Sequence, residues 1–157
     1  MKKLSVYLAT IFGIGYFPVA PGTAGTLFAA LIYYILPASL FKTNYDNFIV
    51  VIFLTGLSLI GVVITSLAEK TLGHDDGKII IDEFVGYFVT ILFLPKSLLL
   101  AIYAFIFFRV FDIAKPQPIY KVQSLPKGWG IMVDDIVAGV FANICLQILI
   151  RIFPQIF

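Results

Sequence analysis

Long apolar runs occupy most of the chain and are separated by short polar segments. A helix that crosses a bilayer needs about 20 mostly apolar residues, and fewer where the bilayer thins. By this measure the pattern predicts about five spans, at 24–41, 48–68, 79–94, 97–114 and 133–153. The third is the shortest, and Pro95 with Lys96 makes a tight turn into the fourth. We therefore expect an all-α fold, a polytopic membrane helical bundle.

The N-terminal residues have a different pattern. Behind Lys2 and Lys3, one helical stripe carries Leu4, Tyr7, Leu8 and Ile11, as in a helix that lies in the membrane interface. We expect such an interfacial helix over residues 4–13. A secretory signal begins similarly, but no small-residue cleavage site ends this segment and Phe17-Pro18 follows directly.

Composition supports a membrane protein of one domain. The 157 residues are 61% hydrophobic and 13% charged, whereas soluble domains are about 45–50% apolar and about 25% charged. No linker or repeat divides the chain, so residues 1–157 are expected to form a single membrane-embedded domain. A net charge of +2 is too small to indicate a nucleic-acid partner. A single cysteine, Cys145, excludes an intrachain disulfide and a multi-cysteine metal site.

The charged residues predict the orientation of the bundle. If the first span leaves the cytoplasm, eight of the 11 Lys and Arg residues lie at the cytoplasmic face, in agreement with the positive-inside rule. Those eight are Lys2, Lys3, Lys70, Lys78, Arg109, Lys115, Lys121 and Lys127. The same topology brings every acidic residue except Asp46 to that face. We therefore expect a polar site there.

Two acidic pairs are candidates for this site. Asp82-Glu83 and Asp134-Asp135 lie within or just before apolar helices, where burial of a carboxylate is costly unless it is compensated. Solvated loops can also collect charge for solubility, but these positions favour function. The lone His74 precedes the first pair among several acids, and it is either solvated or part of a catalytic or substrate-binding site.

A third group of charges recurs every three residues. Arg109, Asp112 and Lys115 share a broad helix face, and prolines end that helix. Two cations beside a carboxylate suit a phosphate next to a metal ion. The alternative is an i,i+3 ladder of ion pairs with basic side chains that reach the interface.

Glycines mark a turn and two helix contacts. The segment around Thr23 has two prolines and two glycines before the first span, so its backbone amides can bind phosphate at a helix N-terminus, although a simple helix-entry turn is an equal alternative. Gly86 lies one turn after Asp82 and leaves room for a neighbouring helix. Gly139 continues the Asp135 face, with Asn143 and Gln147 at further four-residue steps, as expected of a packing surface.

The ligand types and the missing residues narrow the chemistry. Oxygen ligands without a cysteine or histidine cluster indicate Mg²⁺ or a similar hard cation, and nearby Arg and Lys indicate phosphate. A two-histidine phosphatase mechanism is excluded because His74 is the only histidine. The Cys145-to-Arg151 spacing matches cysteine phosphatases, but the segment is apolar helix without glycine. No Asp-x-Asp occurs. A cation transporter with buried acids remains as a non-enzyme alternative.

Four blocks in order resemble the phosphatidylglycerophosphatase A family over residues 13–145. They are Pro-x-x-Pro-Gly-Thr-x-Gly, His-Asp-x-Gly-x-x-x-x-Asp-Glu-x-x-Gly, Phe-Arg-x-x-Asp-x-x-Lys-Pro-x-Pro and Gly-x-Gly-Ile-Met-x-Asp-Asp-x-x-Ala-Gly. One departure is Lys127, where a glycine is the more common residue. The resemblance implies an enzyme of the bacterial inner membrane that uses Mg²⁺ at its cytoplasmic side. It implies hydrolysis of phosphatidylglycerophosphate to phosphatidylglycerol and phosphate. Another lipid phosphate, such as phosphatidic acid, is the alternative substrate.

Charge and resemblance together assign the site residues as a hypothesis. Asp82, Glu83, Asp134 and Asp135 are the expected Mg²⁺ ligands and, with Asp112, the expected catalytic carboxylates. The expected substrate-binding residues are Thr23, His74, Arg109 and Lys115.

Overall fold

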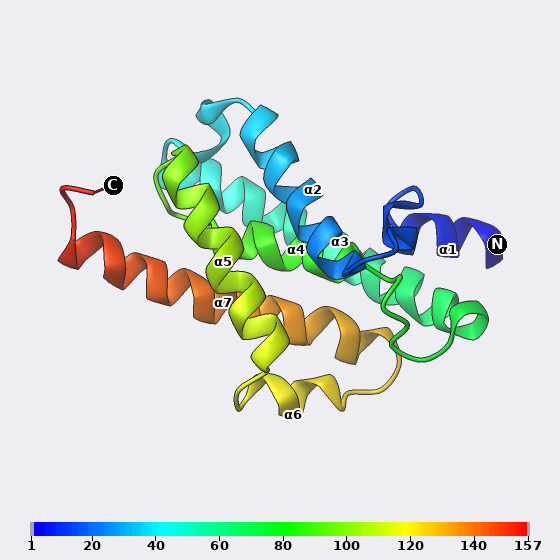
Figure 1. Ribbon diagram of the computed structural model, residues 1–157. Coiled ribbons are helices and arrows are strands. Elements are labelled where there is room, and N and C mark those ends of the chain that lie inside the picture. Colours follow the sequence, from blue (N-terminus) through cyan, green and yellow to red (C-terminus); the bar gives the residue numbers. More distant parts are fainter. Residues whose placement is uncertain (1, 157) are drawn as a thin grey trace.

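The fold is helical throughout the part of the chain that the structure describes. It is a computed structural model that describes residues 2–156, and within them it has α-helices and short 3-10 helices but no strand (Figure 1). The elements are α1 (Lys2–Ala9), η1 (Ile14–Tyr16), α2 (Pro21–Ile35), η2 (Ala38–Phe41), α3 (Asn44–Leu72), α4 (Ile81–Thr90), α5 (Leu98–Ala114), α6 (Ile119–Gln123) and α7 (Gly128–Ile152). The predicted all-α class is confirmed.

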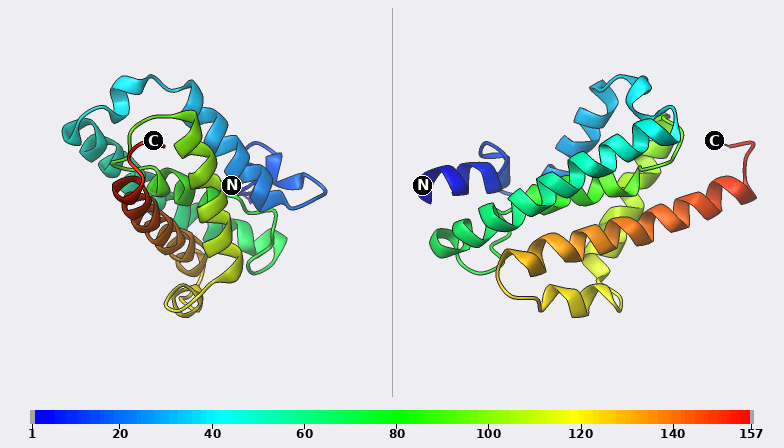
Figure 2. Two further views of the ribbon diagram at one scale, coloured as in Figure 1. Left: turned by 60° about the vertical axis from the view of Figure 1, so that its left-hand side comes forward. Right: turned by 180° about the vertical axis from the view of Figure 1, so that it is seen from behind.

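Helix α4 lies at the centre of the bundle. It packs most extensively against α7 and also contacts α2, α3 and α5, which surround it in the views of Figure 2. Its Val85, Tyr87 and Phe88 are buried, and the Tyr87 hydroxyl donates to the carbonyl of Ala101 in α5 at 3.2 Å. Helix α4, which carries two acidic residues in its first turn, is therefore fixed by several neighbouring helices.

Two helices within the described residues are long and apolar enough to cross a membrane, α3 and α7. Only 22% of the most apolar window of α3 and 33% of that of α7 are buried. Core helices of soluble proteins are mostly buried, so these values favour helices that face lipid. Ile52 is 73% exposed and Phe53 is 66% exposed on α3, which is unfavourable in water but not in a bilayer.

The other predicted spans are shorter as helices than as apolar segments. Helix α4 has 10 residues, which is about 15 Å of helix against about 30 Å of hydrocarbon. It ends at Thr90, where the chain turns, and Asn143 of α7 donates to the carbonyls of Thr90 and Leu92, each at 2.8 Å. Helix α2 has 15 residues and α5 has 17. The number of five spans stays a prediction.

The N-terminal helix is real, but it ends earlier than residue 13. Helix α1 covers Lys2–Ala9 and packs against α3, and Ile11 and Phe12 have positive φ angles that a helix does not allow. Leu4 and Tyr7 are exposed, as an interfacial helix requires, whereas Ile11 is buried. The predicted stripe is therefore wrong at Ile11.

Small residues permit the contact between α4 and α7, as the sequence predicts. A Cβ atom at Gly86 would lie 2.8 Å from the carbonyl oxygen of Asp135, and one at Gly139 would collide with the carbonyl of Gly86. Together with the hydrogen bonds of Asn143, these contacts confirm the predicted packing surface on α7. Short helix α6, which the sequence analysis does not predict, packs against α7 with Ile119 buried.

Candidate active site

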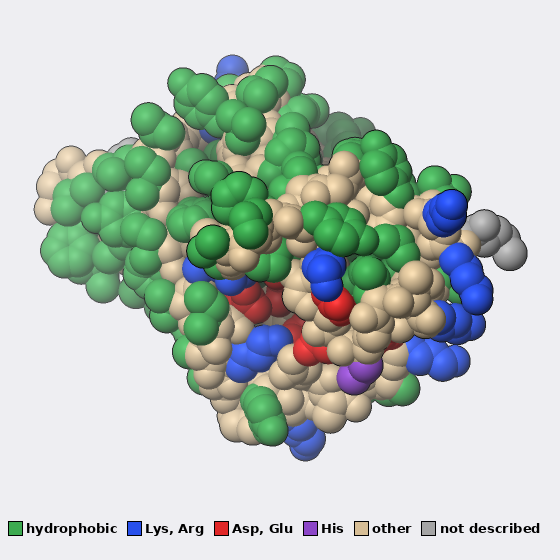
Figure 3. All heavy atoms as spheres, turned by 45° about the vertical axis from the view of Figure 1, so that its right-hand side comes forward, with side chains coloured by type: hydrophobic (Ala, Val, Ile, Leu, Met, Phe, Trp, Pro, Cys, Tyr) green, Lys and Arg blue, Asp and Glu red, His purple; other side chains and the backbone are tan. Residues whose placement is uncertain are grey.

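Three carboxylates meet between α4 and α7. Asp82, Glu83 and Asp135 each offer an oxygen within 4.8 Å of the other two, and we call them the carboxylate cluster. Asp82 and Glu83 lie in the first turn of α4, and Asp135 is on α7 where the glycine contact brings the two helices together. Asp82 is 8% exposed and Asp135 only 2%. Acidic side chains show in a hollow between Lys and Arg side chains in Figure 3.

The cluster is not satisfied by the protein itself. One buried oxygen of each acid, Asp82 Oδ1, Glu83 Oε2 and Asp135 Oδ2, has no hydrogen-bond partner among residues 2–156. Burial of several carboxylates without a partner is strongly unfavourable. A bound cation removes that cost, and an all-oxygen donor set fits a hard divalent ion such as Mg²⁺. The carboxylate cluster can therefore bind a metal ion.

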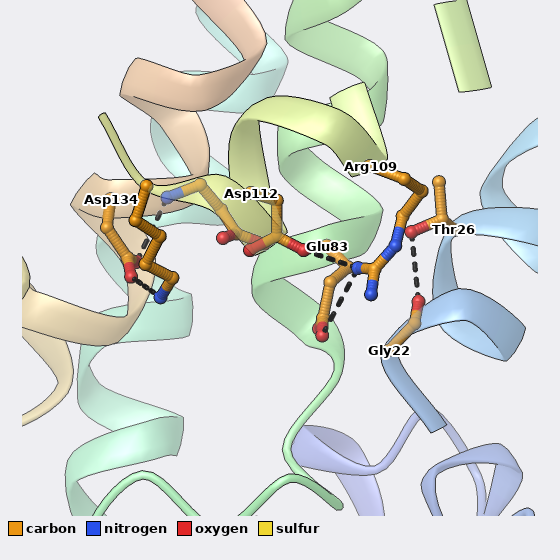
Figure 4. A network of polar contacts seen from close by, with 8 residues as sticks. Gly22, Thr26, Glu83, Arg109, Asp112 and Asp134 are labelled. Atoms are coloured by element: carbon orange, nitrogen blue, oxygen red, sulfur yellow. Dashed lines mark hydrogen bonds and ion pairs between the residues drawn. The ribbon is translucent and has the colours of Figure 1, made fainter. Parts of the chain in front are cut away.

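Arg109 reaches the cluster from α5. Its guanidinium donates to Asp112, one turn later on the same helix, and its Nη1 lies 4.0 Å from Glu83 Oε1 (Figure 4). Its buried Nε has no partner in the described chain. One i,i+3 ion pair of the alternative interpretation therefore forms, between Arg109 and Asp112, and the guanidinium keeps a donor free for an anionic ligand. Phosphate binding by this helix face stays a prediction.

The N-terminus of α2 closes the site opposite Arg109. A Cβ atom at Gly22 would collide with the Glu83 carboxylate and would lie 3.2 Å from Arg109 Nη1. Figure 4 shows Gly22 facing these side chains, with its carbonyl accepting from Thr26 Oγ1 at 2.9 Å. Thr23 follows Gly22 in the first turn and is half-buried. The sequence analysis missed Gly22, although the Pro-Gly-Thr block contains it.

Asp134 points to a different partner from Asp135. Its carboxylate accepts a hydrogen bond from Lys115 Nζ, and its Oδ1 accepts from the backbone N–H of Asp135 at 3.0 Å. Partial burial alone would lower the pKa of Lys115, but the hydrogen bond and charge of Asp134 raise that pKa above its usual value. Lys115 is therefore a cation held next to the carboxylate cluster.

His74 lies apart from the carboxylate cluster. Its side chain is 74% exposed, and its Nδ1 pairs with Glu69 at the end of α3. In the same loop, burial raises the pKa of Asp76, but the hydrogen bonds and charge of Lys78 lower it overall. The structure thus brings eight of the predicted site residues to one region, around the ends of α2, α4, α5 and α7, and leaves His74 at its margin.

The fold and this region define a class, a helical protein with apolar outer faces and an internal site of carboxylates beside fixed cations. A family model described as phosphatidylglycerophosphatase A matches residues 7–150. The chain belongs to the phosphatidylglycerophosphatase A family, and it is an enzyme, a phosphatase. This confirms the resemblance seen in the four blocks.

Three relatives cover most of the chain. The phosphatidylglycerophosphatase A of Haemophilus influenzae is 37% identical over 92% of this chain and 90% of its own length. That of Escherichia coli is 38% identical over 86% of this chain and 77% of its own. A Bacteroides thetaiotaomicron protein with the provisional name phosphatidylinositol-3-phosphatase is 36% identical over 92% of both chains. No solved structure gives a significant match.

Proposed function

We propose that this protein hydrolyses phosphatidylglycerophosphate to phosphatidylglycerol and phosphate with the help of Mg²⁺. The observation that carries the proposal is the carboxylate cluster, whose three buried oxygens lack partners in the described chain and lie next to Arg109. Family membership supplies the substrate class, a phospholipid with a terminal phosphate. The fixed cations Arg109 and Lys115, at the C-terminal end of α5, match that group.

Asp82, Glu83 and Asp135 would hold the ion, with Asp134 and Asp112 as further carboxylates at its edge. When bound there, Mg²⁺ supplies positive charge that offsets the charge developing on the phosphoryl oxygens. Arg109 would hold two phosphoryl oxygens through its fork, and its pair with Asp112 orients the guanidinium. Lys115 would neutralise a third oxygen from the Asp134 side.

The turn before α2 and the loop before α4 complete the proposed substrate site. The Thr23 hydroxyl and the backbone N–H groups of Gly22 and Thr23 would donate to the phosphate, since N–H groups at the start of a helix have no partner within it. His74 would contact the glycerol or phosphate from the margin. Gly22 lets the turn approach Glu83 and Arg109.

We further propose a multi-pass protein of the bacterial inner membrane, a single domain over residues 1–157, with this site at the cytoplasmic face. The excess of Lys and Arg at the site end supports this orientation, and the exposed apolar surfaces of α3 and α7 support the membrane location. Shorter helices α2, α4 and α5 would cross with the help of a thinned bilayer.

A second substrate is favoured by the provisional name of the Bacteroides relative, phosphatidylinositol 3-phosphate. It is also a phosphomonoester on a lipid, so the same cations would bind it. Phosphatidic acid is a third phosphomonoester lipid. The cation-transporter alternative uses the same acids but predicts no phosphate release.

The test is phosphate release by the purified protein in detergent from each of the three lipids at equal concentration. We expect the highest kcat/KM for phosphatidylglycerophosphate, no release in EDTA, and recovery when Mg²⁺ is added back. A higher kcat/KM for phosphatidylinositol 3-phosphate would make that lipid the substrate in place of phosphatidylglycerophosphate. No release from any lipid with Mg²⁺ present would favour transport.

Glu83→Ala and Asp135→Ala test the cluster in the same assay. Each should lower kcat by about 10²–10³-fold, because each removes a carboxylate that positions transition-state charge. Asp46→Ala is the control, since that acid caps the N-terminus of α3 with Thr43 and lies outside the cluster. Near-normal turnover of either cluster variant at saturating Mg²⁺ would remove that residue from the mechanism.

A further inference from the structure

Lys127 adopts a backbone conformation that side chains disfavour. At the start of α7 it has φ 58° and ψ −152°, a region that is essentially restricted to glycine. The next residue is packed tightly against α3, since the N–H of Gly128 donates to Ser66 Oγ at 3.0 Å and a Cβ at Gly128 would collide with Thr65 Oγ1. A lysine is thus kept at a position where glycine would be unstrained.

The side chain of Lys127 lines a cavity of about 530 Å³ at the end of α3. Lys70 and His74 line it as well, and Val62, Val63 and Leu67 form an apolar wall. Glu69 also borders the cavity, but it is already paired with His74. Neither Lys70 nor Lys127 forms an ion pair with any side chain that the structure describes. The cavity therefore has two lysines outside any ion pair at its rim, against one acid that already has a partner.

An apolar groove continues from this cavity between α3 and α7, which lie side by side in both views of Figure 2. The groove has a volume of about 280 Å³, and Val62 borders both spaces. Trp129, which is 45% exposed, lines it close in sequence to Lys127, and Leu59, Val133 and Ile136 line it further along the helices. Tryptophan prefers the membrane interface, between head groups and hydrocarbon.

We propose that this α3–α7 groove binds one anionic phospholipid at a site separate from the carboxylate cluster. Lys70 and Lys127 bind the lipid phosphate, Trp129 lies at the level of the glycerol, and an acyl chain occupies the apolar groove. The order of cations, tryptophan and aliphatic side chains follows the order of groups in such a lipid. None of the three cluster acids is among the described residues that line either space. His74 lines this cavity and also belongs to the margin of the proposed substrate site, so the two sites adjoin there.

Trp129 makes the test direct, because it is the only tryptophan in the sequence. The full chain is placed in vesicles of phosphatidylcholine, and either phosphatidylglycerol or phosphatidylcholine with brominated acyl chains, which quench tryptophan, is added in steps. We expect half-maximal quenching at a lower mole fraction of the anionic lipid, by about fivefold for each lysine that contacts it. Equal quenching by both lipids would mean ordinary surrounding lipid and would overturn the proposal.

Two substitutions at Lys127 and one control complete the experiment. Lys127→Gly and Lys127→Gln should each remove about fivefold of the anionic preference, and Lys127→Gly should also raise the unfolding temperature by relieving the backbone. Lys121→Ala removes an equal charge from α6, outside the cavity, and should leave the preference unchanged. Retained preference in both Lys127 variants would overturn the proposal. Loss of the anionic-lipid preference when inorganic phosphate is added would also overturn the proposal, because it would identify a free anion as the ligand.

Discussion

At the residue scale, Gly22 is a position where one added atom would collide directly with a carboxylate of the proposed active site. The geometry of α2 does not itself require glycine here, because the next residue in the same turn, Thr23, has a side chain. The space beside its Cα is filled by the Glu83 carboxylate, with Arg109 Nη1 just beyond. An alanine there must displace the end of the Glu83 side chain, which the carboxylate cluster needs in place.

Gly22→Ala should therefore lower kcat by about 10²-fold, since displacement of a catalytic group by about 1 Å has an effect of that size. The protein should remain folded, because a carboxylate at the end of a flexible side chain can move. Gly56→Ala is the matched control, since apart from its own stretch of α3 no heavy atom of the described chain lies within 4 Å of the Cβ it would add. Equal activity of the two variants would show that Glu83 needs no fixed position.

Arg109 and Asp112 separate phosphate binding from metal binding. Arg109→Lys keeps the charge but loses the fork, so the rate should fall while the Mg²⁺ concentration for half-maximal activity stays nearly constant. Asp112→Asn should raise that Mg²⁺ concentration, since an amide lacks the anionic charge that favours the ion. Mg²⁺ titrations of phosphate release measure both. If both variants raised the Mg²⁺ concentration for half-maximal activity to a similar extent, the Arg109–Asp112 pair would instead be a structural ion pair that orients a metal ligand.

At the element scale, the contact between α4 and α7 holds the site together. Gly86 and Gly139 bring the helices close, which places Asp135 beside Asp82 and Glu83. Beyond the glycines, Asn143 binds the carbonyls of Thr90 and Leu92 where α4 has ended. A short central helix is stable here because a neighbour satisfies its last carbonyls.

Asn143→Ala should lower the free energy of unfolding by about 1–3 kcal/mol, since it leaves two carbonyl groups without their donor. Gln147→Ala, one turn further along the same face of α7, is the control and should change stability little, because its side chain makes no hydrogen bond with the residues described. Unfolding in detergent, followed by circular dichroism, measures both. Equal stability of the two variants would mean that water donates to these carbonyls when the Asn143 side-chain amide is removed.

At the scale of the whole molecule, the loops at the end opposite the site are joined to each other. Lys96, between α4 and α5, donates to the carbonyls of Tyr34 and Leu36 at the end of α2. Asn47 of α3 accepts from the N–H of Phe93 at 2.8 Å. Lys42 and Lys96 border one surface pocket. The loop between α2 and α3 and the loop between α4 and α5 must therefore lie on the same side of any membrane that the protein crosses.

Accessibility of single cysteines in a Cys145→Ala background tests the proposed orientation. Ser39 and Ser124 are both exposed, the first beside Lys42 and the second between α6 and α7. A membrane-impermeant maleimide should label Ser124→Cys only in inside-out vesicles and Ser39→Cys only in right-side-out vesicles. Labelling of both from one side would contradict the crossing of α3.

The sequence by itself determined the helical class, the two long apolar helices and the meeting of the four blocks. The length and the periodicity of an apolar segment depend only on residues close together in the sequence. Because a helix has a regular geometry, they directly predict its length and which side chains share one face. For the same reason the glycine face of α7 could be predicted, since Gly139 and Asn143 are spaced for one side of a helix. The roles of the site residues remain predictions, although the carboxylate cluster contains three of the four expected metal ligands.

Only the tertiary structure decided which charges face each other. Asp134 and Asp135 are about 100° apart around α7, so the crossing with α4 directs Asp135 into the carboxylate cluster and Asp134 toward Lys115. The spacing of residues along the sequence does not give the angle at which two helices cross, so the sequence analysis assigned the same role to both acids. The same holds for His74, whose partner Glu69 belongs to α3, and for the end of α4, where Asn143, 53 residues beyond Thr90, donates to the Thr90 carbonyl. Contacts between segments far apart in sequence decide these features, and no local pattern encodes them.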